Sequence, residues 1–155
     1  MVQAVKTDKF TTASTSFVDI TGLSVTITPS SSSSKILVRF HTHISNLNYL
    51  GYVNLVRGST SIIRGDAAST RPRVSSGSAG YGDGGAATTS QYNATPASME
   101  FLDSPNTTSA TTYKLQASTF NATYPTTINS TYIDRDLTAY EPRLPSTITV
   151  MEVAG

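Results

Sequence analysis

Short segments in which apolar and polar residues alternate run along most of this chain. The clearest covers residues 35–44 (KILVRFHTHI), where Ile36, Val38 and Phe40 fall on one face and mostly polar residues fall on the other. Alternation with a period of two predicts a half-buried β-strand. The same reasoning predicts strands at residues 17–20, 23–27, 50–56, 62–63, 99–102, 111–120, 127–133 and 147–153.

Turn residues separate these segments. Thr21-Gly22 and Gly58-Ser59 are turn signals, Pro29 cannot donate to a strand ladder, and the serine run 30–34 is expected to be a solvated loop. The last segment, 147–153, has apolar residues on both faces, which predicts a central, buried strand. About nine or ten strands without a convincing helix predict an all-β fold, an antiparallel β-sandwich or jelly roll, in a single domain over 1–155.

Residues 75–90 are expected to form a long Gly/Ser-rich loop within this domain. Five of the ten glycines fall in this stretch, and no apolar alternation interrupts it. Loops of this length in compact domains commonly carry function.

Almost a third of the residues are Ser or Thr (22 and 25 of 155), which suits strands joined by polar turns. The hydrophobic fraction of 37% and the charged fraction of 14% are both below the usual values of about 45–50% and about 25%. Disorder usually combines low hydrophobicity with high net charge, and the net charge here is only +1. We therefore expect a folded domain that depends on contacts between subunits.

Several function classes are disfavoured by composition. The net charge of +1 and the scattered basic residues argue against nucleic acid as a partner. The N-terminus has no signal-peptide pattern and no apolar run approaches the roughly 20 residues of a membrane span, so no membrane association is predicted. The absence of Cys excludes disulfides and thiolate metal sites. No cofactor is expected.

Two short patterns have both a functional and a structural interpretation. His41 and His43 fall on one face of a strand, as in some metal sites, but the chain has no other His to complete the ligand set. A half-exposed sheet face explains the pair better. Arg64-Gly-Asp66 looks like a cell-attachment triplet, but Gly in a turn capped by Asp is the better interpretation of three residues.

Paired carboxylates, as glycosidases use, are available at Asp134, Asp136 and Glu141. Arg135 and Arg143 lie close in sequence, so surface charge balance explains these acids better. No nucleophile elbow, phosphate loop or HExxH pattern occurs in the sequence. The prediction is that the chain is not an enzyme.

Tyrosines in or near the predicted loops are the best candidates for a contact surface, because Tyr is a rigid, amphipathic side chain that is enriched in interfaces and sugar platforms. The candidate contact residues are Tyr81, Asp83, Tyr92, Tyr124 and Tyr140.

An ordered set of short segments resembles a recurring domain of tailed-phage virion proteins, of the type carried by phages of cyanobacteria and marine bacteria. Each segment is short, but together they span nearly the whole chain. Between residues 75 and 98 and around 134–145 the chain follows no pattern of this family. The segments that carry the resemblance are residues 6–10, 16–29, 34–38, 64–67, 102–105, 108–116 and 146–153.

The resemblance implies an antiparallel jelly roll similar to the tumour necrosis factor-like trimers, displayed on the virion exterior after synthesis in the host bacterial cytoplasm. The expected function is that of a homotrimeric capsid cement or decoration protein, which stabilises contacts between subunits of the major capsid protein. The domain begins close to Met1 with no shaft before it, which favours this function over a complete fibre. The alternative is the receptor-binding tip of a tail or head fibre that recognises host surface glycan. A glycan-cleaving enzyme is a third, less favoured hypothesis.

Overall fold

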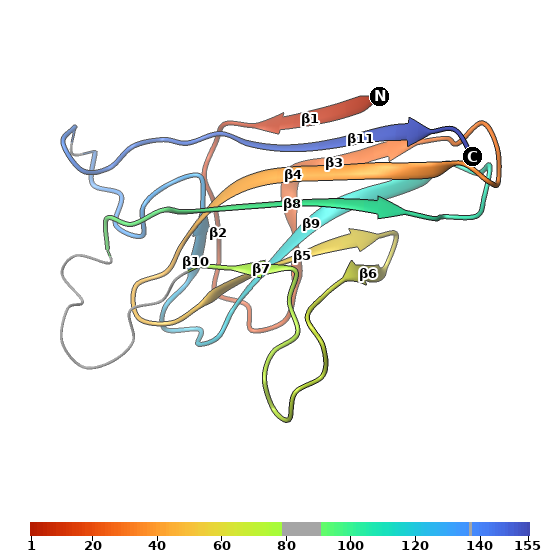
Figure 1. Cartoon of the computed structure of the whole chain (residues 1–155). Helices are drawn as coiled ribbons and strands as arrows, with labels where there is room; N and C mark the ends of the chain where they lie inside the picture. The colour runs from red at the N-terminus through yellow and green to blue at the C-terminus, as the bar shows by residue number, and fades with distance from the viewer. Residues whose placement is uncertain (79–90, 137) are drawn as a thin grey trace.

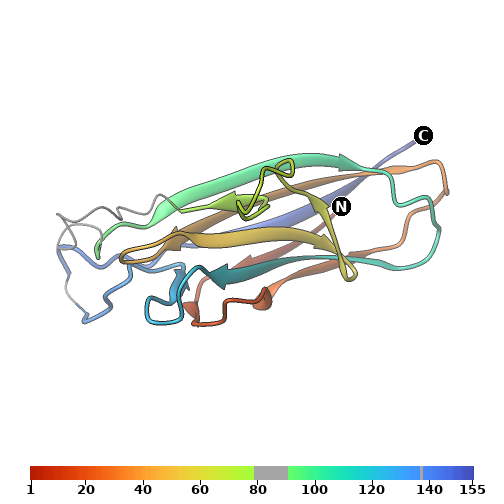
Figure 2. The ribbon, with the colours of Figure 1, turned by 90° about the horizontal axis from the view of Figure 1, so that it is seen from below.

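The computed structural model describes residues 1–78, 91–136 and 138–155, and within these residues every regular element is a β-strand (Figure 1). The strands form two antiparallel sheets packed together as a β-sandwich, so the predicted all-β class is confirmed. Figure 2 shows an elongated body with strands along its length and loops at both ends. The strands are β1 (Val2–Lys6), β2 (Phe10–Thr12), β3 (Val18–Ile27), β4 (Lys35–Ser45), β5 (Gly51–Arg57), β6 (Thr60–Ile63), β7 (Ser76–Gly77), β8 (Thr95–Asp103), β9 (Thr111–Thr119), β10 (Thr126–Ile128) and β11 (Ser146–Val153).

The first sheet, sheet A, is organised around β4. Strand β8 pairs with β4 along one edge, from Ile36 to Ile44. On the other edge, β11 pairs with residues Lys35 to His41 and β10 continues at Ile44 and Ser45. Strand β1 extends the sheet beyond β11, and β2 extends it beyond β10. As a result, β4 is the central strand of sheet A.

The second sheet, sheet B, has the order β3-β9-β5-β6, with the short β7 paired to β5. Consecutive long strands change sheets: β3 belongs to sheet B, β4 to sheet A, β5 to sheet B and β8 to sheet A. These crossings place residues that are distant in sequence across one shared core. The sandwich is thus established, and the jelly-roll connectivity stays a prediction.

The core is formed by the inward faces of both sheets, and the predicted inward face of β4 is confirmed. Ile36, Val38 and Ile44 are completely buried there. Opposite them, Leu23 from β3 and Leu115 from β9 are also completely buried in the same cluster. Burial of each such side chain contributes about 1.5–3 kcal/mol to folding.

The predicted turn at Thr21-Gly22 is instead an irregularity inside one continuous strand, β3. The register with β9 shifts between Asp19 and Ser24, and Gly22 adopts a positive φ of 88°. The side chain of Lys6 runs beneath Gly22, 3.8 Å from the position that a Cβ would occupy. Glycine therefore lets the strand bend over a buried lysine without ending.

One further strand prediction is wrong in its extent, and another is wrong in its burial. The segment 127–133 pairs only as far as Ile128, because Asn129 adopts a left-handed φ of 67° and leaves the ladder. Strand β11 does lie centrally, between β1 and β4, but it is not buried on both faces: Met151 and Val153 are exposed.

The predicted loop 75–90 starts later than the sequence indicates, because Ser76 and Gly77 pair with β5. Residues 79–90 lie outside the described residues. Strands β1 and β2 were not predicted; they are short edge strands of five and three residues. The serine run 30–34 is a loop, as predicted, but Ser34 is buried. Among the residues that the structure describes, no helix has the length and apolar character needed to span a bilayer.

Candidate functional site

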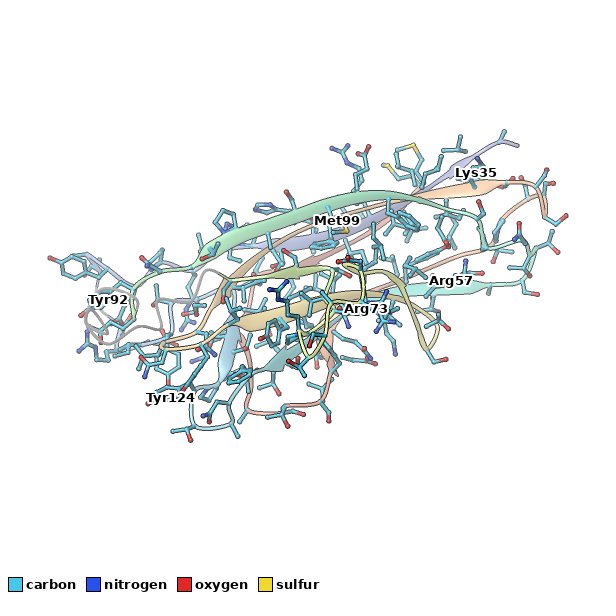
Figure 3. All side chains as sticks on the ribbon, turned by 60° about the horizontal axis from the view of Figure 1, so that its bottom comes forward. Lys35, Arg57, Arg73, Tyr92, Met99 and Tyr124 are labelled. Atoms are coloured by element: carbon cyan, nitrogen blue, oxygen red, sulfur yellow. The ribbon has the colours of Figure 1, made fainter. Side chains whose placement is uncertain are left out.

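One end of the sandwich gathers most of the tyrosines. Ile44 near the end of β4 pairs with Thr95 at the start of β8, and Gly51 at the start of β5 pairs with Thr119 at the end of β9. The loops that follow or precede these positions therefore share one end: residues 46–50, 91–94, 120–125, 129–136 and 138–145. Five of the eight tyrosines lie in these loops: Tyr49, Tyr92, Tyr124, Tyr132 and Tyr140. Figure 3 shows Tyr92 and Tyr124 at this end and Lys35 at the opposite one.

The first group at this end is an exposed aromatic cluster, defined as Tyr49, Leu50, Phe120 and Tyr124. The ring centroid of Tyr49 lies 5.2 Å from that of Phe120 and 5.5 Å from that of Tyr124, both with tilted planes. Such separations are those of interacting aromatic pairs. Phe120 is 56% exposed and Leu50 is 41% exposed, so the cluster presents apolar surface to solvent.

A buried amide holds the two loops of the aromatic cluster together. The side-chain nitrogen of Asn46 donates to the carbonyl oxygen of Tyr124 at 2.6 Å, and its side-chain oxygen accepts from the backbone N–H of Tyr49 at 2.9 Å. Thr119 adds a second bond, from its hydroxyl to the same carbonyl of Tyr124 at 2.7 Å. The exposed rings are therefore mounted on a fixed backbone, which lowers the entropy lost when a partner binds.

The second group contains Tyr92, Tyr140, Arg135 and Glu141. The rings of Tyr92 and Tyr140 lie 5.3 Å apart, and the Arg135 guanidinium sits 5.7 Å from the Tyr92 ring centroid. Arg135 donates to the Tyr92 hydroxyl at 2.7 Å and to Glu141 through both its backbone and its side chain. The Tyr92 bond first, and Glu141 second, raise the pKa of Arg135. The guanidinium is thereby fixed between an aromatic ring and an acid.

The acids in this region are held by cations. Asp134 accepts from Lys9 at 2.8 Å and from Arg143 at 2.9 Å. The hydrogen bond from Lys9, followed by that from Arg143, lowers the pKa of Asp134 below its usual value. Glu141 pairs with Arg135. The predicted pairing with basic residues is found for two of the three acids, Asp134 and Glu141.

The structure places the predicted contact residues as follows. The rings of Tyr92 and Tyr140 contact each other with tilted planes, and Tyr124 belongs to the separate aromatic cluster. Tyr81 and Asp83 lie outside the described residues. Sequence reasoning missed Tyr49 and Phe120, because Phe120 was assigned to the strand 111–120 and only the sandwich topology brings these loops together.

The two histidines contact each other on the outer face of sheet A. Their rings meet edge to face at 4.7 Å, and Nδ1 of His43 lies 3.2 Å from the carbonyl oxygen of Pro145. Burial, and then the neighbouring His41, lower the pKa of His43 below its usual value. No group of three or more His, Asp or Glu residues that could hold a metal ion occurs in the described part of the chain.

A second exposed surface lies on the outer face of sheet A. Met151, Leu37 and Leu102 occupy one register row across β11, β4 and β8, and this set is called the apolar row. Leu102 is 44% exposed and Met151 is 38% exposed. The next row is polar, with an exposed ion pair between Arg39 and Glu100 at 2.8 Å. A shallow hollow of about 690 Å³ lies over the polar row beside Arg39 and Glu100, and Met151 is the member of the apolar row that lines it.

Comparisons with known proteins add no assignment. No protein-family model matches the chain, and no curated protein matches it either. The family resemblance drawn from short segments of the sequence therefore stays a prediction.

Proposed function

We propose that this chain is a non-enzymatic structural protein of a phage particle, which sits on the particle exterior and reinforces contacts between subunits of the major capsid protein. The observation that carries the proposal is the apolar row of Met151, Leu37 and Leu102 on an exposed sheet face. An antiparallel sheet usually turns a polar face to water, and an apolar row on three strands, exposed at Met151 and Leu102 and half-buried at Leu37, favours a partner surface.

The partner proposed for the apolar row is a second copy of this chain, in a homotrimer. The row carries no charge, and its polar neighbours Arg39 and Glu100 neutralise each other. Like surfaces can therefore meet without repulsion. The resemblance to tumour necrosis factor-like trimers supports the same arrangement and the jelly-roll connectivity. The low hydrophobic fraction of 37% is also typical of a chain that shares part of its apolar contacts with other subunits.

The tyrosine-bearing end is then free to meet the rest of the particle. Its exposed aromatic cluster contains no charged residue, and Asn46 fixes the loops that carry it. Rigid, exposed aromatic side chains are typical of the buried centre of protein interfaces. In this proposal the aromatic cluster contacts the capsid, and the trimer clamps neighbouring capsid subunits.

The alternative function is the receptor-binding tip of a tail or head fibre. The observation that favours it is the same end of the molecule, where the rings of Tyr92 and Tyr140 and the aromatic cluster offer stacking surfaces for a host glycan. In that case the tyrosine-bearing end would point away from the particle.

The copy number of this chain per particle distinguishes the two functions. Quantitative mass spectrometry of purified particles, with the major capsid protein as the internal reference, measures it. The proposal predicts a near-stoichiometric ratio to the capsid protein. A ratio of a few per cent would overturn the cement function in favour of a fibre tip, and absence from the particles would overturn both.

A further inference from the structure

The pairing of charges singles out one loop of the molecule. Seven of the eleven basic residues form ion pairs within 4 Å: Lys6, Lys9, Arg39, Arg57, Lys114, Arg135 and Arg143. Among the residues that the structure describes, the four basic side chains outside such pairs are Lys35, Arg64, Arg71 and Arg73. Three of these four lie within ten residues of one another, in the connection between β6 and β7. The unpaired basic residues are therefore concentrated in one connection.

The connection over residues 64–74, which we call the arginine loop, projects away from both sheets (Figure 1). Its three arginines are all exposed, and one acid, Asp66, leaves it a formal charge of +2. Because Lys35 is the one other basic residue of the described chain outside the ion pairs, this loop is where unpaired positive charge is concentrated.

Internal hydrogen bonds give the arginine loop a defined shape. The backbone N–H of Gly65 donates to Val74 at 3.2 Å, and the Nε of Arg73 donates to the carbonyl of Gly65 at 2.8 Å. A turn closes between Ala68 and Arg71 at 3.1 Å. A loop held in this way presents its charges with little further loss of entropy on binding.

The base of the arginine loop is also fixed to sheet B. The Ser75 hydroxyl donates to the carbonyl of Ile63 and accepts from the N–H of Leu55, and the Ser75 N–H bonds to Asn54. Between Arg71 and Arg73, Pro72 restricts the backbone further. The backbone from which Arg71 and Arg73 project is thus restricted by covalent structure and by hydrogen bonds.

We propose that the arginine loop binds an acidic polysaccharide and that its guanidinium groups contact the carboxylate groups of the sugar. Guanidinium groups match carboxylates in geometry and remain charged at any physiological pH. Beside the arginines the loop offers the hydroxyls of Ser69 and Thr70, which suit hydrogen bonds to sugar hydroxyls. The inference stands whether the chain decorates a capsid or ends a fibre.

Two other anionic partners fit the loop less well. A protein interface needs an apolar core, and the large exposed apolar residues of the described chain all lie outside residues 64–74. Nucleic acid binding draws its affinity from many phosphate contacts, commonly about six to ten, whereas three arginines on a chain of net charge +1 supply few.

The test measures binding of the purified full chain to immobilised polygalacturonate, a polymer of uronic acid, by biolayer interferometry. The loop variant is Arg64→Gln/Arg71→Gln, which leaves the Arg73 bond to Gly65 in place. The matched control is Lys35→Gln/Arg39→Gln, which removes the same charge from exposed positions on sheet A. Circular dichroism checks that both variants fold.

The expected result is binding at low salt, about 25 mM NaCl, that is largely lost at about 300 mM. The loop variant should bind about tenfold more weakly, and the control should change less than about twofold. Neutral dextran should not bind. The inference is overturned if the wild-type chain does not bind, or if the control weakens binding as much as the loop variant. It is also overturned if polyglutamate or single-stranded DNA binds as tightly as polygalacturonate.

Discussion

Arg57 on β5 and Asp103 on β8 join the two sheets: Nη1 of Arg57 donates to both carboxylate oxygens, at 2.9 and 2.8 Å. The hydroxyl of Tyr113, on β9, donates to the same carboxylate at 2.7 Å. Asp103 is only 6% exposed, so its charge depends on these partners. Burial, and then the bond to Asp103, raise the pKa of Tyr113 far above its usual value.

Replacement Asp103→Ala should lower the free energy of unfolding by about 2 kcal/mol, because it leaves the buried hydroxyl of Tyr113 and the half-buried guanidinium of Arg57 without their acceptor. Part of the loss is offset by water, which reaches Arg57. Urea denaturation measures the change. The control is Glu100→Ala, which breaks the exposed pair with Arg39 and should cost no more than about 0.5 kcal/mol. Equal losses of stability in the two variants would contradict the role of Asp103 as a buried acceptor between the sheets.

The replacement Gly51→Ala should destabilise the sandwich by about 1–3 kcal/mol through overpacking. A Cβ at Gly51 would lie 2.8 Å from the Thr126 side chain and 2.9 Å from that of Ile44, and both of these are completely buried. Gly65→Ala is the matched control, since a Cβ there meets nothing within 4 Å. Thermal unfolding of both variants measures the difference. A Gly51→Ala protein as stable as the control would show that the end of the sandwich can relax.

The pH dependence of stability should include a contribution from His43. Its folded pKa is lowered from 6.5, so the unfolded chain takes up this proton first as the pH falls. The contribution to stability is therefore fully present above about pH 6.5 and is lost as the pH falls through the lower folded pKa. Denaturation at about pH 7.5 and 5.5 should show a smaller decrease in His43→Gln than in the wild type. An identical decrease in the free energy of unfolding of both proteins would show that His43 makes no such contribution.

Asn46 should matter for both stability and the shape of the aromatic cluster. Asn46→Ala removes the donor to Tyr124 and the acceptor of Tyr49, at an expected cost of about 2 kcal/mol. Amide hydrogen exchange should speed up in residues 46–50 and 120–125 more than elsewhere. Asn48→Ala, in the same loop, is the control. If exchange rises equally in both variants, Asn46 is not the residue that fixes these loops.

The sequence predicted those parts of the fold in which side-chain chemistry follows the strand period. The faces of β4 followed directly from alternation, because Ile36, Val38 and Ile44 are apolar and inward. The strand predicted over 127–133 was wrong beyond Ile128, where residues 129–131 are polar and yet buried. There the side-chain amide of Asn129 donates to the carbonyl of Lys6, a contact between distant segments that no local pattern reveals.

The candidate site was predictable only in part for the same reason. Loop tyrosines are visible in a sequence, but the contact of Tyr49 with Phe120 depends on the start of β5 lying beside the end of β9. In the arginine loop the residues are close in sequence, but their significance depends on the structure. Arg64, Arg71 and Arg73 are near neighbours in the sequence, yet they stand out only once the partners of the other cations are known.

The mass of the purified chain in solution tests most directly the claim that the apolar row joins copies of a structural protein. Size-exclusion chromatography with multi-angle light scattering at micromolar concentration measures it. The account predicts a mass of about 49 kDa, three times the 16.4 kDa of one chain. It also predicts a fall to 16.4 kDa in Leu102→Lys but not in the control Phe120→Ser, which alters exposed apolar surface at the other site. A wild-type chain that stays monomeric, or a Leu102→Lys chain that stays trimeric, would contradict it.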